Sequence, residues 1–279
     1  MPYSAEISRV NPSCFLFLID QSGSMSDPFG GQSGKQKAEG VSDAINRLLQ
    51  NLVIKCAKSE GVRDYFHVGV IGYGSQVVPA LGGALAGRPL VPISEVANSP
   101  IRVEQRTKKV DDGAGGLVDQ SIKFPIWFEP IAEGTTPMRE ALELARNTVA
   151  DFISRTPNCY PPIVVNITDG EANRDPEPAA ASVRDLASSD GGVLLFNAHI
   201  SSKAGAAVEF PSGETELADD YARLLFRMSS VLPPTMRELA RREGFKAEDG
   251  ARGFVFNADL VGVIRFLDIG TRVSQSFFR

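Results

Sequence analysis

Short runs of apolar residues alternate along this chain with segments in which apolar residues recur every three or four positions. The runs at 14–19, 66–73, 163–167 and 193–200 are almost uninterrupted, which is typical of parallel strands buried on both faces. The segment at 36–56 has helical periodicity. The alternation predicts an α/β fold: a doubly wound, mostly parallel central sheet with helices on both faces.

The second half of the chain continues this alternation. Its apolar patterns predict five further helices and a last strand, with helices at 138–152, 175–188, 217–228, 234–243 and 260–267 and the strand at 253–256.

The alternation is interrupted between about residues 79 and 128. This stretch is rich in glycine and proline, and its segments 101–103 and 121–124 alternate apolar and polar residues like the strands of an exposed hairpin. Because the stretch cannot bury a core of its own, we interpret it as a β-rich insertion within one domain that spans residues 1–279. The base of the insertion is expected near the carboxyl ends of the strands, where it would join a partner-recognition rim. The alternative is a solvent-side hairpin without that role.

Composition excludes several classes of function. The formal net charge is -5 and no dense block of Lys and Arg interrupts the chain, so no nucleic-acid partner is expected. No signal-like segment and no apolar run long enough to span a bilayer are present, so no membrane association is expected. The three cysteines are far apart and lack a C-x-x-C spacing. The expected location is therefore the cytoplasm.

The first apolar run ends abruptly at Asp20, in the sequence Asp20-Gln21-Ser22-Gly23-Ser24. In an extended loop, alternate residues point the same way, so Asp20, Ser22 and Ser24 can converge. One carboxylate and two hydroxyls at a strand tip form half of an oxygen site for a hard cation such as Mg2+. The alternative is an Asp turn in which the serines satisfy backbone groups.

Two later loops supply similar groups. The strand at 163–167 is followed by Thr168-Asp169-Gly170, and Gly134-Thr135-Thr136-Pro137 stands just before a helix. Taken singly, Asp169 is also a common turn former and the threonines are common helix caps. In open α/β sheets, however, ligands bind outside the carboxyl ends of the strands, and three such loops on one chain favour a shared site.

These three motifs resemble those of the von Willebrand factor A (VWA) family, in the same order and the same strand context. The resemblance implies a metal-ion-dependent adhesion site in which Ser22, Ser24 and Thr136 supply hydroxyl ligands to Mg2+, with Mn2+ as the alternative ion. It also implies that Asp20 and Asp169 act largely through bound waters. Thr135 stands where the family usually has a second glycine, which is a mild departure.

Neutral ligands leave most of the charge of the ion uncancelled, so the ion should seek a carboxylate from outside. The expected function is a metal-dependent protein-binding module that captures an Asp or Glu of a partner protein. By resemblance to bacterial cytoplasmic VWA proteins associated with tellurite resistance, it would be a signalling or stress-response adaptor, with a kinase, phosphatase or AAA+ ATPase as candidate partners. The alternative is a VWA subunit of an AAA+ complex of the MoxR or magnesium-chelatase kind.

No enzymatic activity is expected. A dehalogenase-type phosphatase needs a second acid two residues after the first, and this chain has Ser22 there. The sequence also contains neither a G-x-S-x-G nucleophile elbow nor a G-x-x-x-x-G-K-[ST] phosphate loop.

Overall fold

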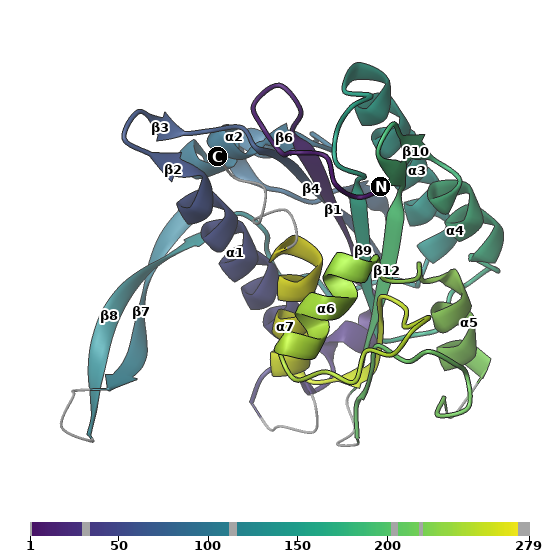
Figure 1. Cartoon of the computed structure of the whole chain (residues 1–279). Helices are drawn as coiled ribbons and strands as arrows, with labels where there is room; N and C mark the ends of the chain where they lie inside the picture. The colour runs from purple at the N-terminus through teal and green to yellow at the C-terminus, as the bar shows by residue number, and fades with distance from the viewer. Residues whose placement is uncertain (1, 30–33, 112–115, 202–205, 218–219, 273–279) are drawn as a thin grey trace.

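The computed structural model of the chain describes residues 2–29, 34–111, 116–201, 206–217 and 220–272 (Figure 1). Its strands are β1 (Ser13–Asp20), β2 (Ala57–Lys58), β3 (Gly61–Val62), β4 (Phe66–Tyr73), β5 (Val77–Pro79), β6 (Val91–Pro92), β7 (Arg102–Asp111), β8 (Leu117–Ile126), β9 (Ile163–Thr168), β10 (Ala187–Ser188), β11 (Gly191–Gly192), β12 (Leu194–Ile200), β13 (Val208–Glu209) and β14 (Phe254–Ala258). Its helices are α1 (Lys37–Cys56), α2 (Ile93–Asn98), α3 (Met138–Arg155), α4 (Glu177–Arg184), α5 (Asp220–Met228), α6 (Pro234–Arg242) and α7 (Leu260–Arg272), with short 3-10 turns η1 (Gly23–Ser26) and η3 (Gly83–Leu85).

The central sheet has eight strands within the described residues, and its main path runs β13-β14-β12-β9-β1-β4-β5. The neighbours from β14 through β4 are parallel, whereas β5, β6 and β13 pair antiparallel at the margins. Numbered along the chain, the five parallel strands stand in the order 2-1-3-4-5, which reverses between β1 and β9. The predicted doubly wound, mostly parallel sheet is confirmed, and this Rossmann-like arrangement is the one that the VWA resemblance implies.

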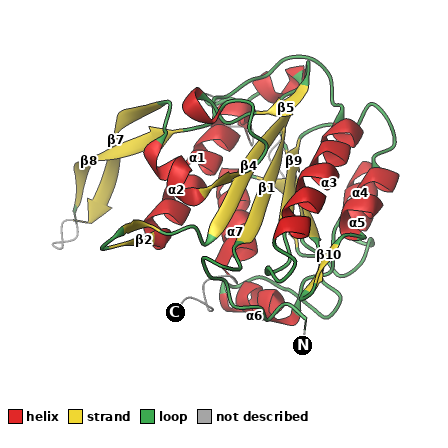
Figure 2. Ribbon diagram, turned by 90° about the horizontal axis from the view of Figure 1, so that it is seen from above, coloured by secondary structure: helices red, strands yellow, loops and turns green. Residues whose placement is uncertain are grey.

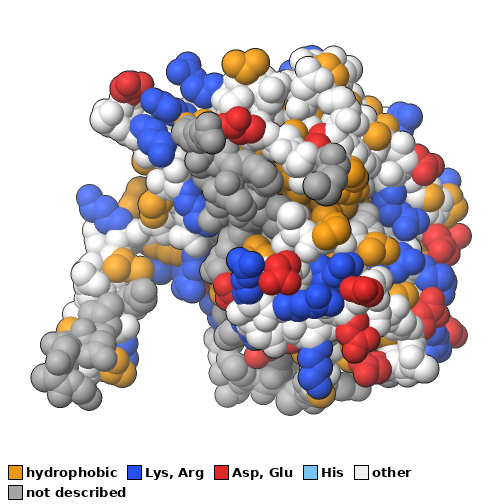
Figure 3. Space-filling view, in the orientation of Figure 1, with side chains coloured by type: hydrophobic (Ala, Val, Ile, Leu, Met, Phe, Trp, Pro, Cys, Tyr) orange, Lys and Arg blue, Asp and Glu red, His pale blue; other side chains and the backbone are white. Residues whose placement is uncertain are grey.

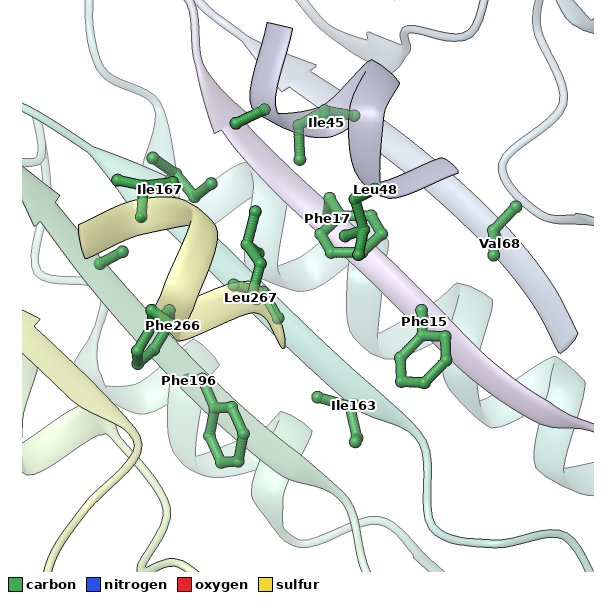
Figure 4. Packing of buried hydrophobic residues seen from close by; sticks show 14 of the residues in the cluster. Phe15, Phe17, Ile45, Leu48, Val68, Ile163, Ile167, Phe196, Phe266 and Leu267 are labelled. Carbon is green, nitrogen blue, oxygen red and sulfur yellow. The ribbon is translucent and has the colours of Figure 1, made fainter. Parts of the chain in front are cut away.

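Helices cover both faces of the sheet, as Figure 2 makes visible. Successive residues of β1 point to opposite faces, so Phe15 and Phe17 pack in one layer while Leu16 and Leu18 pack in the other. The first layer is completed by α1, α6 and α7. Figure 4 shows Phe17 beside Leu48 of α1, with Leu267 of α7 on the same face of the sheet. The second layer is completed by α3, α4 and α5. Burial on both faces explains why β1 is apolar along nearly its whole length.

The stretch that interrupts the sequence pattern shares the main core at its base. Val91 pairs with β4, and the side chains of Trp127 and Phe128 are buried in the same layer as α1. Asn46 of α1 fixes this base, because its side chain accepts hydrogen bonds from the backbone nitrogens of Trp127 (2.8 Å) and Phe128 (3.1 Å) and donates one to the Phe128 carbonyl (2.8 Å).

Beyond its base, the stretch forms the antiparallel hairpin β7–β8, which is the β-rich insertion that the sequence predicts. Figure 1 shows the hairpin extending beside α1 toward the end of the molecule where the parallel strands terminate. Arg106 of the hairpin pairs with Asp43 of α1 at 2.7 Å. Residues 112–115 of the expected insertion lie outside the described residues.

Several predicted boundaries differ from the structure. The helices predicted at 138–152 and 260–267 extend to Arg155 and Arg272. The helix expected to continue to residue 188 ends at Arg184, because Ala187–Ser188 turns back to pair with Gly191–Gly192. The helix expected from residue 217 is described only from Asp220, and residues 218–219 lie outside the described part.

The three cysteines are free and buried. None of the helices within the described ranges combines the length and apolarity that crossing a bilayer requires. On the face drawn in Figure 3, basic and acidic side chains are interspersed.

Candidate functional site

The site begins where β1 ends. Asp20 is fully buried, and its Oδ1 accepts a hydrogen bond from the backbone nitrogen of Ser22 at 2.9 Å. The chain then enters the 3-10 turn η1 rather than the extended loop that the sequence suggested, so that part of the prediction is wrong. The Ser22 and Ser24 hydroxyls nevertheless lie 3.1 Å apart, because the aspartate turn followed by a 3-10 turn brings them to the same side.

The end of β9 provides the facing half of the site. Ile19 of β1 is paired with Ile167 of β9, so the residues that follow each of them are neighbours. Thr168 donates a hydrogen bond from its hydroxyl to Oδ2 of Asp20 at 2.7 Å. Ser24 donates one to Oδ1 of Asp169 at 2.8 Å. These loops meet at the point where the strand order reverses, which is where open α/β sheets bind ligands.

The loop before α3 adds Thr136. Gly134 has φ +87°, and a Cβ atom there would collide with the backbone of Ser75, so only glycine fits. Its carbonyl accepts a hydrogen bond from the backbone nitrogen of Gly23 at 3.1 Å, which ties this loop to η1. A Cβ atom added at Gly170 would lie 3.7 Å from Oγ1 of Thr136 and 3.9 Å from Oγ of Ser24. Both hydroxyls therefore lie beside Gly170.

Sequence reasoning missed Asn173, which holds the threonine loop in place. Its backbone nitrogen donates to the carbonyl of Thr136, and its side-chain oxygen accepts from the nitrogen of Thr136, both at 3.1 Å. Its Nδ2 also donates to the hydroxyl of Thr135 at 2.8 Å. Thr135, which departs from the VWA pattern, is thus hydrogen-bonded to Asn173. An asparagine in a polar loop carries no sequence signal for this role.

Burial dominates the electrostatics of the site. It raises the pKa of Asp20 to about 6, and the nearby charge of Asp169 raises it further, while hydrogen bonds from Ser22 and Thr168 oppose the change. Burial also raises the pKa of Tyr221, whose hydroxyl lies 3.3 Å from that of Thr168. An ionised Asp20 is therefore costly unless a positive charge is close.

Lys37 is the second functional residue that sequence reasoning missed. It is only 3% exposed, and its ammonium forms an ion pair with Oδ2 of Asp169 and lies 3.6 Å from Asp27. One signal was present: Lys37 stands in the first turn of α1, where the helix dipole disfavours a cation.

The structure brings all five residues expected at the site to one place, namely Asp20, Ser22, Ser24, Thr136 and Asp169. Their donor atoms are all oxygens, from two carboxylates and three hydroxyls, which is the set that suits a hard cation. Within the described residues, no cluster of three or more His, Cys, Asp or Glu side chains is arranged as a conventional metal centre. Metal ligation by the five stays a prediction, and their chemistry fits it.

No protein-family model and no curated protein matches the sequence. Among solved structures, the conserved hypothetical protein BatB from Bacteroides thetaiotaomicron is 17% identical over 94% of this chain and 99% of its own, with a TM-score of 0.44. The PilB minor pilin from Streptococcus sanguinis is 11% identical over 96% of this chain and 63% of its own, with a TM-score of 0.49. The vWF domain of the type V pili tip protein Mfa5 from Porphyromonas gingivalis is 18% identical over 58% of this chain and 39% of its own, with a TM-score of 0.29. Similarity at this level carries no argument about function, and the strand order gives a Rossmann-like fold that is consistent with a VWA-like one.

Proposed function

We propose that this chain is a metal-dependent protein-binding module. A divalent cation, Mg2+ or Mn2+, would be held by the hydroxyls of Ser22, Ser24 and Thr136, with Asp20 and Asp169 orienting its waters. The observation that carries the proposal is the convergence of these hydroxyls at the reversal point of the sheet: those of Ser24 and Thr136 lie beside Gly170, and that of Ser22 lies 3.1 Å from that of Ser24.

The chemistry of the donors supports binding as the role of the site. A bound ion would supply a positive charge that three neutral hydroxyls leave largely uncancelled, so a carboxylate from outside can complete its coordination. Ser24 is exposed, so that side of the site opens to solvent. Asp20 is buried behind it and accepts hydrogen bonds from Ser22 and Thr168, which orient the carboxylate without bringing it to the surface. The partner group is therefore an Asp or Glu side chain.

We assign no catalytic step to this chain. The proposal keeps the cytoplasmic adaptor role that the resemblance implies, with a kinase, phosphatase or AAA+ ATPase as candidate partners. The subunit role in an AAA+ complex stays the alternative.

The test compares two serines of one loop. Ser24→Ala removes a hydroxyl that borders the proposed ion position, whereas Ser26→Ala removes one that donates to the carbonyl of Gly23. Calorimetric titration with Mn2+ should give binding to the wild type and to Ser26→Ala, and binding weakened by at least about tenfold in Ser24→Ala. Asp169→Ala is less informative, because it would leave the buried ammonium of Lys37 without its closest partner.

The partner is tested by affinity capture from a lysate with the same proteins. A partner retained by the wild type and by Ser26→Ala in Mg2+, and lost both in EDTA and with Ser24→Ala, supports the proposal. Replacing the Asp and Glu residues of that partner one at a time by Asn and Gln should then abolish capture at one position. Retention that is indifferent to the metal and to Ser24 contradicts a metal-dependent site.

A further inference from the structure

A buried cation stands beside the proposed metal position. The ammonium of Lys37 is ion-paired with Oδ2 of Asp169, and the other oxygen of that carboxylate accepts the hydrogen bond from Ser24. The side chain of Asp169 is 0% exposed and that of Lys37 is 3% exposed. Water therefore screens this pair poorly, and its charges act strongly on any ion bound nearby.

The backbone holds Lys37 in this position. Its nitrogen donates to the carbonyl of Asp27 and the nitrogen of Phe29 donates to the carbonyl of Lys35, both at 2.9 Å, so the two segments are paired. Phe29 is buried against α1, where a Cβ atom added at Gly40 would come within 2.7 Å of its ring. A glycine at that position lets the ring lie directly on the helix, which fixes the first turn that carries Lys37.

A second cation so close to the site must compete with a metal ion. We propose that Lys37 is a built-in competitor that shares Asp169 with the ion and thereby lowers the affinity of the site for divalent cations. This inference rests on the proposed function. Its physical basis is the repulsion, in a poorly screened environment, between the ammonium that pairs with Asp169 and a divalent ion whose waters the same carboxylate would orient. The site would then fill only at raised metal concentration, so Lys37 sets the threshold for partner binding.

The experiment measures Mn2+ affinity by electron paramagnetic resonance in the wild type and in four variants. Lys37→Met removes the charge, Lys37→Gln removes it but keeps a donor for Asp169, and Lys37→Arg keeps the charge. Lys35→Met is the matched control, because Lys35 lies two residues away and pairs with Asp43 rather than with the site. The rise in melting temperature on adding Mn2+ gives a second measurement, which remains usable if Lys37→Met is unstable without metal.

We expect both neutral variants to bind Mn2+ at least about tenfold more tightly than the wild type, with a larger Mn2+-induced rise in melting temperature. Lys37→Arg and Lys35→Met should bind within about threefold of the wild type. If the neutral variants bind no more tightly than the wild type, or if Lys37→Arg binds as tightly as Lys37→Met, the inference is wrong while the proposed function stands. If neither the wild type nor any variant binds Mn2+, the proposed function fails together with it.

Discussion

Replacing Asp20 by Asn should stabilise the metal-free protein. Burial raises the pKa of this carboxyl from 3.8 to about 6, which corresponds to a cost of about 3 kcal/mol for keeping it ionised in the folded state. The amide removes the charge and keeps both contacts: its oxygen can accept from the nitrogen of Ser22, and its NH2 group can donate to the hydroxyl of Thr168. At neutral pH in EDTA, Asp20→Asn should therefore raise the free energy of unfolding by about 2 to 3 kcal/mol.

The stability gained by Asp20→Asn should decrease as the pH falls. The folded-state pKa lies above the unfolded value, so the cost of Asp20 is fully present above about pH 6 and disappears as the pH falls toward 3.8. Urea denaturation followed by circular dichroism, in EDTA and across this range, measures the difference between variant and wild type. In Mg2+ the difference in free energy of unfolding between Asp20→Asn and the wild type should shrink or change sign, because the ion stabilises the ionised carboxylate of the wild type.

A control of the same chemistry is Asp175→Asn. Asp175 is exposed, and its side chain accepts a hydrogen bond from the backbone nitrogen of Glu177, a capping contact that asparagine also makes. The free energy of unfolding of Asp175→Asn should therefore differ from that of the wild type by less than about 0.5 kcal/mol. If Asp20→Asn were instead less stable than the wild type at neutral pH in EDTA, the hydrogen bonds to the ionised carboxylate would outweigh its burial, and the reasoning would be refuted.

Three further perturbations follow from the same structure. Tyr73→Phe removes the hydrogen bond to Oδ1 of buried Asn166 (2.6 Å) and should lower the free energy of unfolding by about 1 to 3 kcal/mol in urea denaturation, whereas an unchanged midpoint would mean that the acceptor finds another donor. Asn46→Leu removes three buried hydrogen bonds to the backbone of Trp127 and Phe128, while Ser42 of α1 still donates to the Phe128 carbonyl. It should cost about 2 to 4 kcal/mol in the same assay, and a loss below about 1 kcal/mol would contradict the anchoring role of Asn46. Replacing residues 105–123 by an Asn-Gly turn shortens the hairpin at paired positions and should weaken partner capture while Mn2+ affinity in calorimetry stays the same; unchanged capture would place recognition elsewhere.

The main elements of the fold could be predicted because their signals are local. The apolar run of β1 and the spacing of apolar residues in α1 each specify one element with little ambiguity, and the structure places both within a residue or two of the predicted bounds. The end of α4 could not be placed in this way, since it depends on the pairing of Ala187–Ser188 with Gly191–Gly192.

Within the candidate site, too, some residues could be predicted from local sequence signals and others could not. Asp20 and Asp169 follow buried strands, so the rule that parallel strands end at one edge of a sheet brings them together without a structure. Lys37 and Asn173 act across the tertiary structure, through contacts with residues far away in the sequence. No spacing rule predicts such contacts. The backbone conformation that brings the Ser22 and Ser24 hydroxyls together was also mispredicted, because a 3-10 turn and an extended loop can both place two such hydroxyls on one side.

Helix α1 couples two regions that the sequence separates widely. Its 20 residues form one stiff rod of about 30 Å, with Lys37 at the end that touches the site. About 14 Å along the helix from Lys37, Asn46 is hydrogen-bonded to the base of the hairpin. Because one helix carries both contacts, the distance between the candidate site and the base of the hairpin is fixed by the backbone hydrogen bonds of α1, and a bend in this helix would change it.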